Sequence, residues 1–312
     1  MFLRSSAALA AAVLLSAGSP ASAADPVVDA AWVKAHIAQP DIVFVDLRPV
    51  AEYEKSHVPG AVHTDFAKDG WRVNKVLDKQ TGDKIAGLLP DPASLEKLIG
   101  GLGIDNATHV VLLSPGKAAA DLGMSTRLYW TFLVLGHKNV SVVNGGMSAY
   151  LKDKSDPLET GKVTPRAKTF TAHLDTTYLA TAADVSADLA NHVPLLDNRP
   201  TDQNLGVNKS GVVTRYGTLP GAKSIPALWM TENGGGMLRD AASLRKLYAA
   251  AGVPTEGDAV TFCNTGHWAS LGWFVNAEIL GNKKTKMYDG SMTEWSHLDP
   301  ATHPMIAKMA VN

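Results

Sequence analysis

The stretch Ile42-Val43-Phe44-Val45-Asp46-Leu47-Arg48 returns in the second half of the chain as Val193-Pro194-Leu195-Leu196-Asp197-Asn198-Arg199. Each copy is a short apolar run that ends in Asp-x-Arg. Such a run is typical of a buried strand in a parallel sheet, which delivers polar groups at its carboxyl end. The recurrence therefore predicts an internal repeat built on strands of this kind.

Further matches follow in the same order in both halves. The turn residues Pro59-Gly60-Ala61 correspond to Pro220-Gly221-Ala222. Amphipathic helices are expected at 91–98 and 240–247, and apolar strands at 110–113, 140–143, 259–262 and 286–288. This alternation predicts an α/β fold with two domains in tandem, each a mainly parallel sheet flanked by helices.

The length of the chain also favours two domains, because 312 residues exceed what one hydrophobic core usually organises. We place the first domain at 25–153 and the second at 177–304. The segment 154–176 between them lacks hydrophobic periodicity and contains two prolines and a glycine. It is interpreted as the interdomain linker.

The first residues differ from the rest of the chain. Arg4 supplies a positive charge, Ala7 to Gly18 form a short apolar run, and Ala21-Ser22-Ala23 ends it with small residues. This pattern predicts a cleavable secretory signal at 1–23, and hence a periplasmic or secreted protein. The run is too short to span a membrane, so we expect no stable membrane anchor.

The formal net charge is −1, and no dense block of Lys or Arg is present. Nucleic acid is therefore not expected as a partner, and small-molecule chemistry is the more natural expectation.

Cys263 is the single cysteine of the chain, so an intramolecular disulfide is impossible. It follows the apolar strand at 259–262, whereas the first half has Ser114 at the matching position. A lone cysteine is often only a small buried residue. Ligands of parallel sheets gather at the carboxyl ends of strands, however, and this favours a functional role for Cys263.

The residues after Cys263 form the second part of the candidate site. They are Asn264, Thr265, Gly266, His267, Trp268, Ala269 and Ser270, and an apolar helix is expected at 271–280. A loop that curls between a strand and a helix points backbone N–H groups inward, and with the helix dipole it holds an anion. That anion would be the Cys263 thiolate, and Gly266 would permit the curl.

Three cationic residues of the second half are further candidates. Arg199 has its counterpart in the half without a cysteine, so a structural ion pair with Asp197 is the favoured role, with substrate binding still open. Lys209 and Arg215 lie in a polar segment that only the second half contains, and they either bind substrate or are solvated surface charges.

His267 is either a general base, a metal ligand or a packed loop residue. No HExxH or CxxC pattern accompanies it. We therefore expect neither a metal nor a cofactor.

Three motifs together resemble the rhodanese family of sulfurtransferases. They are Tyr53-x-x-x-His57-Val58-Pro59-Gly60-Ala61, Cys263-x-x-Gly266-x-x-Ala269, and the stretch Tyr288 to Trp295, in which Met292 replaces the usual aromatic residue. The resemblance covers essentially the whole mature chain in tandem form. It implies that the second domain is catalytic and that the first has lost its cysteine.

The resemblance also implies a two-step reaction. The Cys263 thiolate takes the sulfane sulfur of a small donor as a persulfide and passes it to a thiophilic acceptor such as cyanide or a thiol, including a thiol of a protein. Thiosulfate-using members carry cations directly after the cysteine, and mercaptopyruvate-using members carry Gly-Ser/Thr-Gly. Because this chain has Asn264-Thr265, the donor stays open.

No clear match exists for the further arginine that the family places after the Asp-x-Arg strand. A protonated His267, or one of the cations Arg199, Lys209 and Arg215, is the expected counter-ion of a dianionic donor.

Two other enzyme classes need a residue that this chain lacks. A phosphatase of similar fold needs an arginine where Ala269 stands, and a disulfide oxidoreductase needs a second cysteine. A non-enzymatic sulfur carrier or protein-binding module stays open, because His267 and Trp268 suit either a gated pocket or a protein contact.

Overall fold

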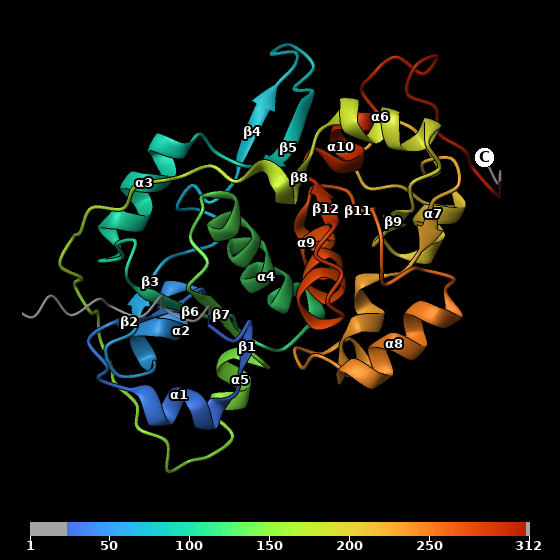
Figure 1. Cartoon of the computed structure of the whole chain (residues 1–312). Coiled ribbons are helices and arrows are strands. Elements are labelled where there is room, and N and C mark those ends of the chain that lie inside the picture. The colour runs from blue at the N-terminus through green and yellow to red at the C-terminus, as the bar shows by residue number, and fades with distance from the viewer. Residues whose placement is uncertain (1–23, 310–312) are drawn as a thin grey trace, which may run out of the picture.

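The computed structural model describes residues 24–309, so the predicted signal at 1–23 lies outside the described residues. Two five-stranded sheets organise the chain (Figure 1). The first has the order β1-β7-β6-β2-β3, and the second, read in the same sense, has the order β8-β12-β11-β9-β10. Every neighbouring pair in both sheets is parallel. The predicted α/β fold with two tandem domains is confirmed.

The strands that the repeat predicts are all present. Those of the first sheet are β1 Val27–Val28, β2 Ile42–Asp46, β3 Val62–His63, β6 His109–Leu113 and β7 Val140–Val143. Those of the second sheet are β8 Leu179–Ala180, β9 Leu195–Asp197, β10 Lys223–Ser224, β11 Ala259–Phe262 and β12 Thr285–Tyr288. The central strands are apolar because helices cover both faces of each sheet.

Helices follow most strands. In the first domain they are α1 Ala30–His36, α2 Val50–Lys55, α3 Pro92–Gly101, α4 Ala119–Val134 and α5 Gly146–Tyr150. In the second they are α6 Ala182–Ala190, α7 Thr201–Leu205, α8 Ala241–Ala250, α9 His267–Phe274, continued by a π-helical turn at Val275–Ile279, and α10 Ser291–Trp295. No helix within residues 24–309 is both long and apolar enough to cross a bilayer.

Matching caps explain why the repeat is visible in the sequence. The Asp91 side chain accepts a hydrogen bond from Ser94 N at 3.0 Å at the start of α3, and Asp240 accepts one from Ser243 N at 2.9 Å at the start of α8. An aspartate at this position satisfies a backbone N–H that the first helical turn leaves free.

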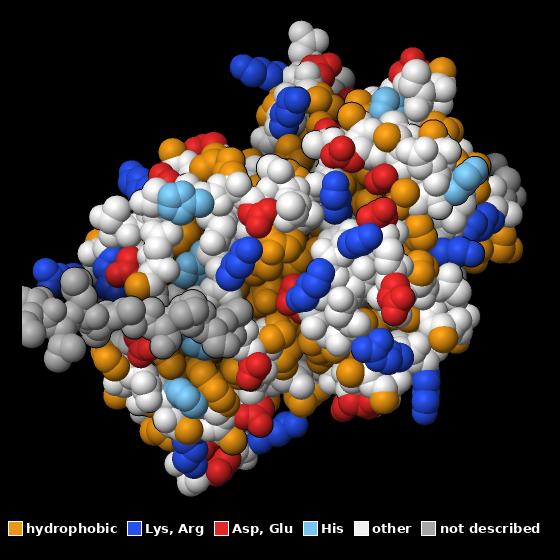
Figure 2. All heavy atoms as spheres, in the orientation of Figure 1, with side chains coloured by type: hydrophobic (Ala, Val, Ile, Leu, Met, Phe, Trp, Pro, Cys, Tyr) orange, Lys and Arg blue, Asp and Glu red, His pale blue; other side chains and the backbone are white. Residues whose placement is uncertain are grey.

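The two domains pack against each other through α4 and α9, which lie side by side at the centre of the molecule (Figure 1). Thr126 Oγ1 and Ser270 Oγ are 3.0 Å apart across this contact. On the face shown in Figure 2, hydrophobic side chains follow the seam between the domains. The domains therefore share a buried contact at the carboxyl end of β11.

Two equivalent hydrogen bonds cross the seam. Leu89 N donates to Asp289 Oδ2 at 2.7 Å, and Leu238 N donates to Asn144 Oδ1 at 2.8 Å. Each joins the segment before a helix of one domain to the end of the last strand of the other. The halves are thus arranged with approximate twofold symmetry.

A β-hairpin breaks this symmetry. It consists of β4 Val73–Val76 and β5 Lys84–Leu88, which pair antiparallel and project from the first domain (Figure 1). The repeat did not predict it, because the second half has no matching strands. Ala86 N donates to Thr293 Oγ1 at 3.2 Å, so the base of the hairpin lies on the second domain.

The segment between the domains has no helix or strand from 152 to 175, apart from a bridge between His57 and Glu159. It runs against the first domain, where Lys168 N donates to Gly100 O at 2.9 Å. The linker at 154–176 and the boundaries 25–153 and 177–304 stay predictions.

Candidate active site

Cys263 directly follows β11, the central strand of the second sheet, between the ends of β9 and β12. It is a free thiol and only 2% exposed. Its N–H donates to Ser291 Oγ at 3.2 Å, and its carbonyl accepts from Met292 N at 3.0 Å. The backbone that carries the thiol is therefore fixed to the start of α10.

The loop after Cys263 turns sharply into α9. Gly266 has φ +72°, and a methyl group there would overlap the Arg127 guanidinium, so only glycine fits. The backbone N–H groups of Asn264, Thr265 and Gly266 make no hydrogen bond within residues 24–309. Free N–H groups at the start of a helix provide the setting for an anion that the loop sequence predicts.

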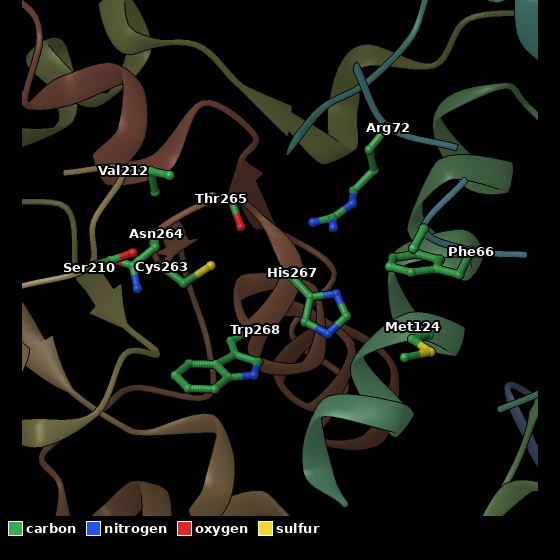
Figure 3. Close-up of a pocket in the computed structure, with 11 residues that line it drawn as sticks. Phe66, Arg72, Met124, Ser210, Val212, Cys263, Asn264, Thr265, His267 and Trp268 are labelled. Carbon is green, nitrogen blue, oxygen red and sulfur yellow. The ribbon is translucent and has the colours of Figure 1, made fainter. Parts of the chain in front are cut away.

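A cavity of about 510 Å³ opens in front of the thiol (Figure 3). Both domains line it: the first supplies Phe66, Ala67, Arg72 and Met124, and the second supplies Ser210, Val212, Cys263, Asn264, Thr265, His267 and Trp268. The site is therefore not a property of the cysteine-bearing domain alone.

Arg72 is the cation of this cavity, and sequence reasoning missed it. It lies just before β4, and its guanidinium stacks on the Phe66 ring at 4.9 Å. Burial lowers its pKa and the nearby Arg127 charge lowers it further, while Cys263 and Asp289 oppose the shift.

Arg127 and Asp289 hold the parts of the site together. Arg127 projects from α4, is fully buried, and places Nη2 at 2.5 Å from Asp289 Oδ1. Its guanidinium also donates to Gly87 O at 3.2 Å and to Gly266 O at 3.4 Å. One side chain thus connects the hairpin, the Cys263 loop and the end of β12.

His267 is neutral and packed between the domains. Its Nε2 lies 2.8 Å from Ala120 O, and because a carbonyl only accepts, the proton is on Nε2. Burial, together with the charges of Arg72 and Arg127, lowers its pKa to about 4. At neutral pH His267 therefore cannot be the cationic counter-ion that the sequence suggested. No cluster of three or more potential metal ligands occurs in residues 24–309.

Comparison with known proteins agrees with this geometry. The rhodanese-like domain family matches residues 29–153 and 181–298. The chain belongs to the rhodanese family.

Individual relatives span nearly the whole chain. A Mycobacterium tuberculosis protein, named as a candidate thiosulfate sulfurtransferase, is 30% identical over 283 residues, which cover 88% of this chain and 95% of that protein. The sulfur carrier protein TtuD of Thermus thermophilus is 29% identical and matches 86% of this chain and 92% of its own length.

Among solved structures, SseA of Escherichia coli, described as a 3-mercaptopyruvate sulfotransferase, has a TM-score of 0.71 at 24% identity, covering 86% of this chain and 99% of its own. At this identity the likeness shows the rhodanese fold alone. The family and the sequence relatives show that the protein is a sulfurtransferase.

The other loop residues of this rhodanese divide into two groups. Asn264 and Thr265 line the cavity, and Asn264 Nδ2 donates to Gln203 Oε1 at 2.9 Å. Ala269 and Ser270 are buried away from it, and Ser270 Oγ donates to His267 O at 2.7 Å. The last two residues thus serve the domain contact.

The Asp-x-Arg pairs have the same geometry in both domains. Arg199 Nε and Nη2 donate to the Asp197 carboxylate at 2.9 and 2.7 Å, and Arg48 binds Asp46 in the same way. Burial alone would raise the pKa of Asp197, but the Arg199 charge and the hydrogen bonds from Arg199, Asn204 and Thr218 together hold it below its usual value. Arg199 does not line the cavity.

Lys209 and Arg215 also point elsewhere. Lys209 Nζ donates to Val213 O at 2.9 Å, and Arg215 donates to backbone carbonyls, including Trp295 O at 2.7 Å and His303 O at 2.9 Å. Neither lines the cavity. Lys209 bonds within the segment that only the second half contains, and Arg215 holds that segment against the end of α10 and the residues after it.

Proposed function

We propose that Cys263 carries the transferred sulfur as a persulfide. The observation that carries this proposal is the position of the thiol. Cys263 lines a cavity of about 510 Å³, and the N–H groups of the next three residues, 264 to 266, have no partner within residues 24–309. Such N–H groups stabilise a sulfur anion without a full positive charge.

The reaction has two steps. The Cys263 thiolate attacks the sulfane sulfur of a small donor such as thiosulfate, a new S–S bond forms, and the old bond breaks with its electron pair leaving on sulfite. Cyanide or a thiol then attacks the outer sulfur and releases the Cys263 thiolate. No step requires a general base, which agrees with a neutral His267 engaged to Ala120.

Thiosulfate and 3-mercaptopyruvate are both donors to be tested. The mycobacterial relative is named for the first and SseA for the second. The residues after Cys263 match neither pattern of the family, so the loop alone does not choose between them.

The test compares the mature protein with Cys263→Ser. Each is incubated with thiosulfate and, separately, with 3-mercaptopyruvate, and thiocyanate release is measured beside the intact mass. We expect turnover and an adduct of about +32 Da, one sulfur atom, only when Cys263 is present. Ser114→Ala is the matched control, because it changes the equivalent position of the first domain and should keep full activity.

If neither donor gives an adduct or turnover, the proposal is wrong. A sulfur carrier is the second candidate, and similarity to TtuD favours it. A carrier would acquire the adduct of about +32 Da and pass it once to a thiol protein, without repeated turnover on cyanide. Steady-state kinetics with cyanide therefore separate the two.

We also propose that the protein is exported to the periplasm or secreted, as the sequence at 1–23 suggests. Cell fractionation, with N-terminal sequencing of the purified protein, tests this. A mature protein that begins near Ala24 outside the cytoplasm is the expected result, and an uncleaved cytoplasmic chain would contradict it.

A further inference from the structure

Arg72 has the features of a ligand-binding residue rather than a structural one. Among the side chains that line the cavity it alone carries a positive charge, given that His267 is neutral. It forms no ion pair or hydrogen bond with residues 24–309, whereas the buried Arg127 beside it is paired with Asp289. A largely desolvated charge without a partner is costly, and an anion in the cavity would offset that cost.

The guanidinium is also held in position. It stacks on Phe66 at 4.9 Å, and in Figure 3 its end points into the space between Thr265 and His267, on the side where Cys263 lies. A methyl group on Gly87 would stand 3.3 Å from Arg72 Nη1 and 2.9 Å from Thr265 O, so the hairpin backbone closely confines this region.

The remaining walls of the cavity are mostly apolar. Phe66, Met124, Val212 and Trp268 surround the space that Arg72 enters (Figure 3). Thiosulfate has five heavy atoms and fills at most about 150 Å³, at the ~30 Å³ that liquid water occupies per molecule. The cavity of about 510 Å³ therefore has room for an apolar body beside the anionic group.

We propose that the donor is an organic sulfur compound with one anionic group on an apolar body, and that Arg72 of the first domain binds this group. The inference rests on the proposed sulfur transfer at Cys263. Under this proposal, the domain without a cysteine helps to determine donor specificity. It also supplies from the hairpin the cation that the Cys263 loop lacks.

Organic thiosulfonates are suitable probes because they have this composition. The Cys263 thiolate attacks the terminal sulfur of R–SO₂–S⁻, forms the persulfide anion, and releases the sulfinate R–SO₂⁻ with the electron pair of the broken bond. Charge and atoms balance without a further reactant. The methanethiosulfonate and benzenethiosulfonate anions carry the same reacting group on a small or a large apolar body.

The first experiment measures donor kinetics on the mature protein with cyanide as acceptor. Burying a phenyl ring against apolar walls favours binding more than burying a methyl group does. We therefore expect a KM for benzenethiosulfonate at least about tenfold below that for methanethiosulfonate. Equal KM values, or a lower KM for the smaller anion, would overturn the assignment of an apolar body.

The second experiment tests Arg72 without requiring sulfur transfer. Iodoacetate and iodoacetamide alkylate Cys263 by the same displacement of iodide, but only iodoacetate carries an anionic group. Rates are measured for the mature protein, Arg72→Ala, Arg72→Lys and the control Lys75→Ala. Lys75 is an exposed cation of the same hairpin, so the control removes equal charge outside the cavity.

We expect Arg72→Ala to slow iodoacetate about 10- to 100-fold, the range for a hydrogen-bonded charge pair, and to change the iodoacetamide rate less than about threefold. Arg72→Lys should retain part of the selectivity, and Lys75→Ala all of it. If both rates fall together, or neither falls, Arg72 does not bind the anionic group. Absence of the adduct of about +32 Da with every donor would instead refute the proposed function. The ratio of the iodoacetate rate to the iodoacetamide rate would still show whether Arg72 binds an anionic group.

Discussion

The Ser114 loop and the Cys263 loop occupy equivalent places in the two domains, but the cavity of the active site is lined by the Cys263 loop and not by Ser114. Their backbones are anchored alike: Met147 N donates to Ser114 O at 2.8 Å, and Met292 N donates to Cys263 O at 3.0 Å. Ser114 is 1% exposed and Cys263 is 2% exposed. The difference therefore lies in what covers each loop.

Backbone closes the space around Ser114. A methyl group on Gly116 would overlap Gly145, and one on Gly236 of the other domain would overlap Gly116. The cover of the Cys263 loop is the hairpin that bears Arg72, and it leaves a cavity of about 510 Å³. The comparison indicates that loss of the cysteine and loss of the cavity accompany each other in the first domain.

Moving the cysteine tests this difference most strongly. In the double variant Ser114→Cys/Cys263→Ser we expect no persulfide and a turnover at least about 10³-fold below that of the unchanged protein, because a nucleophile that donors cannot reach gains nothing from its position. Intact mass after incubation with thiosulfate and thiocyanate release measure the result.

A control variant separates loss of reactivity from loss of folding. Ser114→Cys alone, with Cys263 intact, should have full activity and so show that the chain still folds. An adduct of about +32 Da on the thiol introduced at position 114 of the double variant would mean that the loop itself, and not its cover, determines reactivity.

The second prediction concerns the equivalent side chains at the ends of the last strands. Asp289 pairs with Arg127 and accepts from Leu89 N, whereas Asn144 only accepts from Leu238 N. Asp289→Asn leaves the Arg127 charge buried without its partner, so we expect the free energy of unfolding to fall by about 3–5 kcal/mol.

Asn144→Ala removes one neutral hydrogen bond and should cost about 1 kcal/mol. Urea denaturation of both variants compares them. Equal losses of unfolding free energy in the two variants would show that the Arg127–Asp289 ion pair adds no stability beyond that of the equivalent neutral hydrogen bond.

The features that were predictable from the sequence are those formed by continuous stretches of the chain. Buried parallel strands appear as apolar runs, and the turn into α9 needs a glycine, so the sheets and the Cys263 loop were predictable. Arg72 was not, because the hairpin has no copy in the second half and its contact with the loop joins distant parts of the chain. The sequence also left Arg199, Lys209 and Arg215 open as donor-binding residues, since charge alone does not show which carbonyl or carboxylate a side chain has already bound. The structure places all three outside the lining of the cavity.

The third prediction concerns the pH dependence of stability. The Cys263 loop contains His267, which titrates, whereas the matching position of the first loop is Ala118, which does not. The pKa of His267 is about 4 in the folded protein and about 6.5 when unfolded. Below about pH 6.5 the unfolded chain takes up a proton that the folded chain refuses until about pH 4. The stability present above about pH 6.5 is therefore lost as the pH falls through this window, by up to about 3 kcal/mol.

His267→Gln retains a donor for Ala120 O but has no such titration. Its free energy of unfolding, measured by urea at about pH 7, 5.5 and 4.5, should depend less on pH than that of the unchanged protein. Other histidines whose pKa burial lowers, such as His109 and His137, titrate in both proteins and cancel in the difference. Parallel curves for the two proteins would mean that the pKa of His267 is the same in the folded and the unfolded chain, so that the fold does not hold the imidazole neutral.

The smallest expected effect on activity comes from the hairpin that covers the Cys263 loop. Gly87 and Gly82 both lie in the hairpin region with φ +81° and +77°, so alanine strains either backbone by roughly 1 kcal/mol. Only at Gly87 does the added methyl group press on Thr265, whereas nothing lies within 4 Å at Gly82. We expect Gly87→Ala to lower kcat/KM for thiosulfate about tenfold, equivalent to ~1.4 kcal/mol. Gly82→Ala should leave kcat/KM unchanged, although its backbone bears the same kind of strain. A similar kcat/KM for the two variants would mean that activity does not depend on the close contact between the hairpin and the Cys263 loop.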